Sequence, residues 1–458
     1  MNQNKHEEQN EKHSQIKEYL DQICGQVKVK EVHNDLREEL GSHLEEMIRD
    51  KKQEGYKPDE AAAYAVQQMG DPAELGKRMN KLHRHRMHWR LLAAVIMMGV
   101  IGMVLTWIYT NSSLGLGFDY SSTHLMYTSV GIMTMLFFIF FDYRKWIKWA
   151  WPIYILINVM LWITPMLAEA YGGSNRFLFL PFGISIDVTT SALWILPLAI
   201  GAIMMDRFRL VPSKQMICTY TALAALPMVL IYQISDWVRL SLFGFTALLL
   251  FGWVTRKWLY TVIAACSCGV AAVLIFLLTD EYRRFERLSV LFNLDNASKG
   301  EGYANNAIID IVRTAGWWGN GITIPQNSPF RYYYLDFPGV MLVEVFGWSA
   351  CVLLIVGIVW LVRTMIKMLP RIQETFGSII VVSVTAVLAL QLIYSAAAVT
   401  GIMPILSIRF PLIGYSSHVI LEYAMIGLLL GVYRRKDTVL LSGSRTRNHT
   451  GERMILPR

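Results

Sequence analysis

The sequence predicts an all-α, polytopic membrane protein with about ten transmembrane helices and a small N-terminal cytoplasmic helical domain. Three observations lead to this fold class. Hydrophobic residues make up 54% of the 458 residues and charged residues only 17%, which is too apolar for an ordinary soluble enzyme. Apolar runs long enough to cross a bilayer recur from residue 90 onwards. Basic residues gather on alternate links between these runs.

Four parts are predicted along the chain. Residues 1–13 are expected to be a disordered N-terminus, and residues 14–85 a cytoplasmic helical domain. Residues 86–436 form the predicted ten-helix membrane domain, with a large extracellular loop at 280–337, and residues 437–458 a polar cytoplasmic tail. Because the first 85 residues are strongly polar, we expect no cleavable signal peptide.

Periodic apolar residues predict four helices in the N-terminal domain. Gly55 and Gly70 end the second and third of them. Pro58 and Pro72 open the third and fourth, and Asp71 is a natural N-cap. The segments EELGSHLEEMI and GYKPDEAAAYAVQQMGDPAEL resemble the small helical prefix domain that precedes permease-like and regulatory membrane proteins. Its role is open between a docking or sensing module and a folded spacer.

The apolar runs also predict the topology. Lys and Arg follow the second, fourth, sixth, eighth and tenth runs, and a basic cluster precedes the first. Since basic loops stay in the cytoplasm, both termini are expected inside and the 280–337 loop outside. The predicted runs lie at 90–109, 124–141, 149–169, 188–205, 217–233, 238–254, 258–279, 339–363, 377–400 and 414–433.

Charge and cysteine content exclude several classes of protein. The net charge of +8 does not indicate nucleic-acid binding, because the basic residues stand beside apolar runs. The five cysteines fall in the helical domain or within apolar runs, so no disulfide framework is expected. His83, His85 and His88 lie in a basic juxtamembrane run and are interpreted as surface residues rather than metal ligands.

The longest polar interval of the membrane domain lies at residues 280–344, and a loop of this length is usually functional or disordered. Its many aromatic residues argue against disorder. The segments GEGYANNAIIDIVRTAGWWGNGI and LDFPGVMLVEVFGW resemble the shape, elongation, division and sporulation (SEDS) family of FtsW, RodA and SpoVE. This resemblance places Asp336 on the acidic residue taken as catalytic in the family and Glu344 on the first family glutamate.

Two further segments extend the resemblance. YGGSNRFLFLPFGISI, at 171–186, carries Arg176 onto a family arginine. QLIYSAAAVTGIMPILSIRFPLIGYSS keeps Gln391 and Tyr415 in place, and His418 stands near its end, where the family has small residues. The resemblance therefore covers about residues 90–433 in four ordered segments.

The resemblance implies a peptidoglycan glycosyltransferase that polymerises the lipid-linked disaccharide-pentapeptide, lipid II, at the outer face of the bacterial cytoplasmic membrane, for cell shape or division. It also implies a class B penicillin-binding transpeptidase as partner. Such a transfer needs a carboxylate base for the sugar hydroxyl and cations for the leaving pyrophosphate. We expect Asp336 to be the base, with a divalent cation there as an open alternative, and Arg176 to grip the pyrophosphate.

The remaining candidates each have a simpler interpretation. Arg331 and Arg409 are substrate-binding candidates or interfacial anchors. Glu344 and Glu422 lie inside apolar runs, where a charge is costly, so they are functional candidates unless neutral and hydrogen-bonded. Asp336 itself could be an N-cap of the eighth span. Further candidates from the resemblance are Gln391 and Tyr415, while Trp317 and Trp318 suit either sugar stacking or an interfacial aromatic belt.

Departures from the family pattern support an alternative function. FRYYYL replaces the family's Leu-Pro-Glu before the aspartate, and Phe177 stands where the family has tryptophan. The alternative is a non-catalytic relative that binds the lipid-linked precursor or a cell-wall partner and acts as regulator or scaffold. A transporter of lipid-linked sugars is disfavoured, because no span shows the paired Gly/Pro breaks of inverted repeats.

Overall fold

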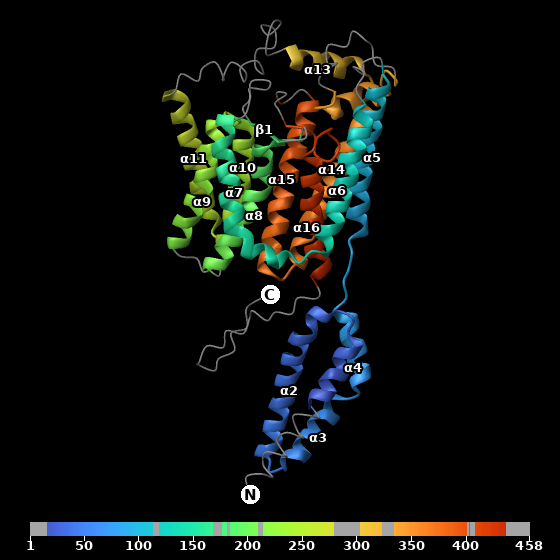
Figure 1. Ribbon diagram of the computed structural model, residues 1–458, viewed down its shortest axis with the longest axis vertical. Helices are drawn as coiled ribbons and strands as arrows, with labels where there is room; N and C mark the ends of the chain where they lie inside the picture. Colours follow the sequence, from blue (N-terminus) through green and yellow to red (C-terminus); the bar gives the residue numbers. More distant parts are fainter. Residues whose placement is uncertain are drawn as a thin grey trace. The chain divides into compact units, whose positions relative to one another are not determined.

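A computed structural model describes most of the chain, and within the described residues the fold is all-α apart from one two-stranded hairpin (Figure 1). The predicted fold class is confirmed. Contacts divide the chain into two compact units, Met1–Met87 with Tyr433–Arg458, and His88–Val432. The described residues are 16–112, 119–167, 176–180, 184–208, 214–278, 303–322, 334–400, 403 and 408–436.

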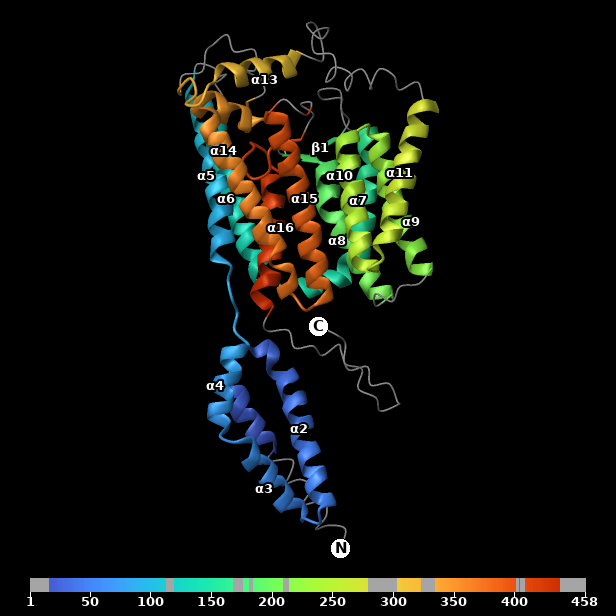
Figure 2. The same cartoon turned by 180° about the vertical axis from the view of Figure 1, so that it is seen from behind.

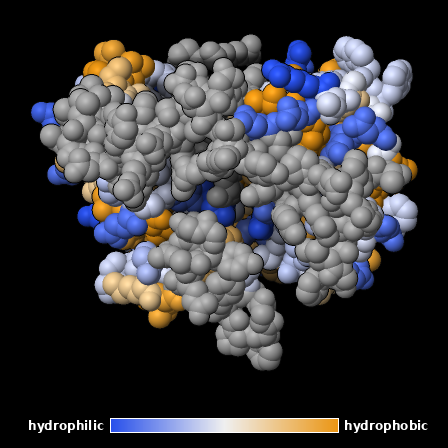
Figure 3. Space-filling model, turned by 90° about the horizontal axis from the view of Figure 1, so that it is seen from above, coloured by the Kyte–Doolittle hydropathy of each residue, from blue (hydrophilic) through white to orange (hydrophobic). Residues whose placement is uncertain are grey.

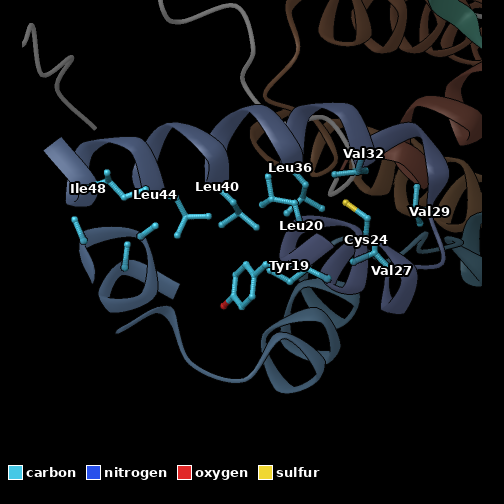
Figure 4. Close-up of a cluster of buried hydrophobic side chains, with 14 residues drawn as sticks. Tyr19, Leu20, Cys24, Val27, Val29, Val32, Leu36, Leu40, Leu44 and Ile48 are labelled. Atoms are coloured by element: carbon cyan, nitrogen blue, oxygen red, sulfur yellow. The ribbon is translucent and has the colours of Figure 1, made fainter. Parts of the chain in front are cut away.

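The N-terminal unit is a small helical bundle. Residues 16–26 are helical and are followed by η1 (Lys30–Val32), α2 (His33–Gln53), α3 (Pro58–Met69) and α4 (Pro72–Leu82). As predicted, the Asp71 side chain caps α4, accepting a hydrogen bond from the Ala73 amide at 3.1 Å. Apolar side chains of α2, from Leu36 to Ile48, pack with Tyr19 and Leu20 in one buried cluster (Figure 4). The unit therefore has a core of its own.

Eight helices of the described residues are long and apolar enough to cross a membrane. They are α5 (Trp89–Asn111), α6 (Tyr120–Phe140), α7 (Trp146–Leu167), α8 (Val188–Phe208), α9 (Lys214–Gln233), α10 (Trp237–Thr255), α14 (Pro338–Ile366) and α15 (Thr375–Val399). Two further helices, α11 (Trp258–Leu278) and α16 (Val419–Arg435), occupy the other two predicted runs. Short 3₁₀ turns, η2 (Tyr143–Lys145) and η5 (Leu369–Arg371), precede α7 and α15.

Two buried helices organise the membrane unit. Helix α8 contacts α7, α9, α10 and α15 (Figure 2), and most of its side chains are buried. Helix α16 approaches α6 closely at Gly431, because glycine has no side chain there. A Cβ on Gly431 would lie 2.8 Å from the Phe138 carbonyl oxygen. Large apolar side chains such as Met133 and Phe137, 70% and 60% exposed, lie on the outer surface, as expected for a lipid-facing helix.

Helix α14 is broken at Gly347, which the sequence analysis did not predict. The φ of Gly347 is 79° and its ψ is −174°. The backbone of residues 316–321 pairs with the break, so the interrupted helix keeps its polar groups satisfied. Asn320 and Gly321 amides donate to the Glu344 and Val345 carbonyls at 2.7 and 3.2 Å, and Trp348 and Ser349 amides donate to the Gly316 and Trp317 carbonyls at 3.0 and 3.2 Å.

Replacing Gly347 by alanine is expected to destabilise the protein by at least about 2 kcal/mol. A side chain there would adopt a φ that L residues rarely take, and its Cβ would overlap the Trp317 carbonyl and the Gly319 amide. Thermal unfolding of the two proteins in detergent measures the effect. Gly357→Ala is the matched control, because nothing lies within 4 Å of a Cβ at Gly357 in the same helix. Equal unfolding midpoints for the two variants would contradict this account.

Candidate functional site

A short β-hairpin positions the first charged pair of the site. Strand β1 (Phe177–Leu180) pairs antiparallel with β2 (Ile184–Asp187), and Phe177 lies opposite Asp187. The Val188 amide donates to the Arg176 carbonyl at 3.1 Å, which closes the end of the hairpin. Arg176 and Asp187 therefore stand side by side, and the Arg176 Nε atom lies 3.3 Å from the Asp187 Oδ2 atom. Arg176 was expected in this motif from the sequence, but the strands were not predicted.

The first turn of α10 supplies a second charged pair. Asp236 is the N-cap of α10 and accepts a hydrogen bond from the Arg239 amide. The Arg239 guanidinium lies 2.6 Å from the Asp236 Oδ2 atom and 3.0 Å from the Asp187 Oδ2 atom. Arg239 also donates through Nε to the Thr190 hydroxyl at 2.8 Å. All these groups are buried or nearly so, which joins the hairpin, α8 and α10 in one ionic network.

The two arginines of the network are not equivalent. Arg239 has the short contacts to both carboxylates, whereas Arg176 lies 3.3 Å from Asp187 and 3.8 Å from Asp236. Burial, and then the nearby charge of Arg239, lower the pKa of Arg176 to about 10, so it stays protonated at neutral pH. The carboxylates therefore hold the Arg176 guanidinium less closely than that of Arg239, and Arg176 can bind an incoming anion.

The acid stability of the protein is expected to depend on Asp187. Burial by itself raises the pKa of this carboxyl, but the charges of Arg239 and Arg176 hold it well below its usual range. Since the unfolded carboxyl has a pKa near ~3.9, the stabilisation is fully present above that pH and is lost as the pH falls through the folded value. We expect the thermal unfolding midpoint to decrease as the pH falls below about 4, and to decrease less steeply in Asp187→Asn. Equal slopes for the two proteins would contradict this assignment.

Asp336 lies in a second ion pair of the site. Its Oδ1 atom accepts a hydrogen bond from the Arg409 Nε atom at 2.7 Å, and Arg409 also donates to the Ser416 hydroxyl at 2.9 Å. The Asp336 side chain is 41% exposed. The N-cap of α14 is Phe337, and no side chain caps that helix. The interpretation of Asp336 as a helix cap is therefore wrong. Arg409 forms an ion pair, and its interpretation as an interfacial anchor stays open.

A buried glutamate supports the loop that carries Arg409. The Glu422 Oε2 atom, on α16, accepts a hydrogen bond from the Leu412 amide at 2.6 Å. Leu412 has a positive φ of 66°, a conformation that costs a non-glycine residue about 1–3 kcal/mol. Glu422 therefore holds a strained turn three residues after Arg409. This explains why a carboxylate is present in an apolar run, as the sequence analysis noted.

The two ion-paired groups border one cleft. It is lined by Arg176, Arg239, Arg409 and His418 together with Gln391 and Glu422, among others. The Gln391 Oε1 atom is buried and has no hydrogen-bond partner within the described part of the chain. Figure 3, a view from above, shows hydrophilic residues at the rim and near the middle of the molecule. Asp336 reaches the cleft through its contact with Arg409.

Two other predicted site residues lie elsewhere. Glu344 is buried in the first part of α14, where it accepts a hydrogen bond from the Tyr334 hydroxyl, and it does not line the cleft. Tyr415 packs edge-on against Tyr120, at 5.6 Å between ring centroids, and is also absent from the lining. Arg331 lies outside the described residues. Trp317 and Trp318 are 68% and 86% exposed, which suits either interpretation given above.

Asp236 and Arg239 were not predicted as site residues from the sequence. Arg239 lies inside the predicted apolar run 238–254, so the rule that marked Glu344 and Glu422 as costly charges also applies to it. Asp236 had no such signal, because a polar residue between two spans is ordinary. Within the described residues, no three His, Cys, Asp or Glu side chains gather in a way that could hold a metal ion.

The chain is similar in sequence to several known proteins. The family model described as "Cell cycle protein", for FtsW, RodA and SpoVE, matches residues 85–438. The chain is 23% identical to a "Probable peptidoglycan glycosyltransferase FtsW" of Trichlorobacter lovleyi, covering 75% of this chain and 92% of the relative. It is 22% identical to peptidoglycan glycosyltransferase MrdB of Escherichia coli K12, covering 67% and 84%.

The fold is similar to solved structures of low sequence identity. One is a chain of a peptidoglycan synthase complex in which polymerization and crosslinking are coordinated, with a TM-score of 0.64 at 15% identity, covering 76% of this chain and 98% of the other. Another is the rod shape determining protein RodA of Thermus thermophilus, with a TM-score of 0.56 at 15% identity, covering 76% and 97%. At 15% identity these similarities show the fold alone.

Proposed function

This chain belongs to the FtsW, RodA and SpoVE family of cell cycle proteins, and from that premise we propose that it is a peptidoglycan glycosyltransferase that polymerises lipid II. The distant relatives that bear this name support the proposal. In this proposal the protein acts at the outer face of the bacterial cytoplasmic membrane, with both termini in the cytoplasm. The alternation of basic loops along the chain supports that orientation.

The observation that carries the proposal is the meeting of an accessible carboxylate with several guanidinium groups at one cleft. Asp336 is 41% exposed and touches Arg409, which lines the cleft together with Arg176. Glycosyl transfer from a lipid pyrophosphate requires both kinds of group. In the proposed reaction Asp336 takes the proton of the attacking sugar hydroxyl while that oxygen forms a bond to the anomeric carbon. The bond from this carbon to the pyrophosphate breaks, and the electron pair leaves with the pyrophosphate.

Arg176 is proposed to bind the leaving pyrophosphate. Its contacts to carboxylates are longer than those of Arg239, so phosphate oxygens can compete for its guanidinium. Arg239 keeps its ion pairs with Asp187 and Asp236 while Arg176 is engaged. Gln391, whose buried Oε1 atom lacks a partner among described residues, is proposed to accept a hydrogen bond from the substrate. A divalent cation beside Asp336 stays an open proposal.

A second function is supported by the ion pair of Asp336 with Arg409. Because one carboxylate oxygen is already engaged, the cleft would also suit a non-catalytic relative that binds the precursor and regulates or scaffolds cell-wall synthesis. The partner in either case is proposed to be a class B penicillin-binding transpeptidase. The similarity to a chain from a polymerization and crosslinking complex supports this choice.

Polymerisation of labelled lipid II by the purified protein decides between the two functions. The assay is run in vesicles, with the protein alone and with candidate transpeptidases, and the products are separated by length. Glycan strands that depend on this protein are the result expected of the glycosyltransferase. Binding of the precursor without strand formation under every condition would support the non-catalytic relative instead.

A further inference from the structure

A basic cleft in the N-terminal unit is separate from the proposed active site. It is lined by Lys28, Lys77, Lys81 and Arg84, with Asn80, Val29, His83 and His85 between them. Four of these side chains are cations at neutral pH, and the lining contains no carboxylate within the part of the chain that the structure describes. Such a concentration of one sign of charge repels itself unless an anion neutralises it.

Close packing brings these cations together from distant parts of the chain. Gly76 lies so near the helix at residues 16–26 that a Cβ on it would be 2.7 Å from the Gln26 Cβ atom and 2.9 Å from the Ile23 carbonyl oxygen. The Lys28 amide donates to the Asn80 side-chain oxygen at 3.0 Å. Lys28 is therefore fixed beside Asn80 of α4, 52 residues further along the chain, and the cleft is built by the fold.

The cleft lies close to the bilayer along the chain. Helix α5 begins at Trp89, four residues after His85, and four residues span at most about 14 Å. Leu82, at the end of α4, is 61% exposed. Exposed apolar and basic side chains next to a membrane span are the features that bind a bilayer of negative surface charge.

We propose that this cleft binds the phosphate headgroup of an anionic phospholipid in the membrane that α5 enters. The charge of the lining selects an anion, the described lining residues offer no carboxylate for a cation, and the short connection to α5 identifies the bilayer as the source of the anion. Phosphatidylglycerol is the probe for this chemistry. The inference is independent of the glycosyltransferase activity.

The test measures how fast lysines of the full-length protein react with a water-soluble acylating reagent in nanodiscs. One set of discs contains phosphatidylcholine alone, and the other also contains phosphatidylglycerol. We expect Lys28, Lys77 and Lys81 to react about fivefold more slowly with phosphatidylglycerol, the effect of one cation at an anionic surface. Exposed Lys17, Lys52 and Lys57 of the same unit, which do not line the cleft, are expected to react equally in both.

Two further measurements complete the test. Lys77→Gln with Lys81→Gln should remove the protection of Lys28, whereas Lys52→Gln with Lys57→Gln should leave it unchanged. Equal rates in both discs, or the same slowing at the three control lysines, would overturn the proposal. Protection by free glycerol phosphate in phosphatidylcholine discs would also overturn it, because the site would then take a soluble phosphate rather than a lipid.

Discussion

Replacing Asp336 by asparagine is expected to lower lipid II polymerisation by about 10²–10⁴-fold, the contribution typical of a general base. Asparagine keeps an oxygen at the position that accepts from the Arg409 Nε atom at 2.7 Å, so the geometry of the loop should survive. It cannot take a proton from a sugar hydroxyl. Because the side chain is 41% exposed, the change should cost little stability.

The matched control for this prediction is Asp310→Asn. Asp310 is an exposed carboxylate on α13 (Tyr303–Thr314), so its variant has the same change of charge away from the cleft. Both proteins are compared with wild type for strand synthesis, precursor binding and thermal unfolding. Activity of Asp336→Asn within about tenfold of wild type, with normal folding, would move the base to another residue.

The helices were predictable because their physical signals are local. Runs such as 188–205 and 377–400 show their apolar length directly in the sequence, and α8 and α15 cover both. The break in α14 was not predictable in this way, because its run stays apolar through Gly347. The pairing of residues 316–321 with the broken turn stabilises that conformation, and such a pairing depends on tertiary structure.

The site was predictable only in part for the same reason. Arg176 and Asp336 were named from motifs, but each motif shows one residue and not its partner. The partners Arg239 and Arg409 lie more than 60 residues away along the chain and are brought near by the packing of α8, α10 and α15. Glu344 matched a motif equally well, yet its side chain accepts a hydrogen bond from Tyr334 and does not line the cleft.

Replacing Asp187 by asparagine is expected to destabilise the membrane unit by about 3–5 kcal/mol, the cost of leaving a buried charge without its partner. The carboxylate accepts from the Thr189 hydroxyl at 2.7 Å and the Thr190 amide at 3.0 Å. It also faces the guanidinium of Arg239 at 3.0 Å. Without the charge of Asp187, Asp236 is the one carboxylate that pairs with the two buried arginines within the described residues. Thermal unfolding in detergent measures the loss, and Asp206→Asn, an exposed site at the other end of α8, is the matched control.

A second substitution separates the loss of charge from the loss of hydrogen bonds. If an uncompensated cation is the cause, Arg176→Gln combined with Asp187→Asn should be more stable than Asp187→Asn alone, because the buried charges balance again. Arg176→Gln alone should unfold at a lower temperature than wild type. A double variant that is less stable than either single variant would mean that Asp187 acts through its hydrogen bonds to Thr189 and Thr190. The ionic network would then position the hairpin without setting its stability.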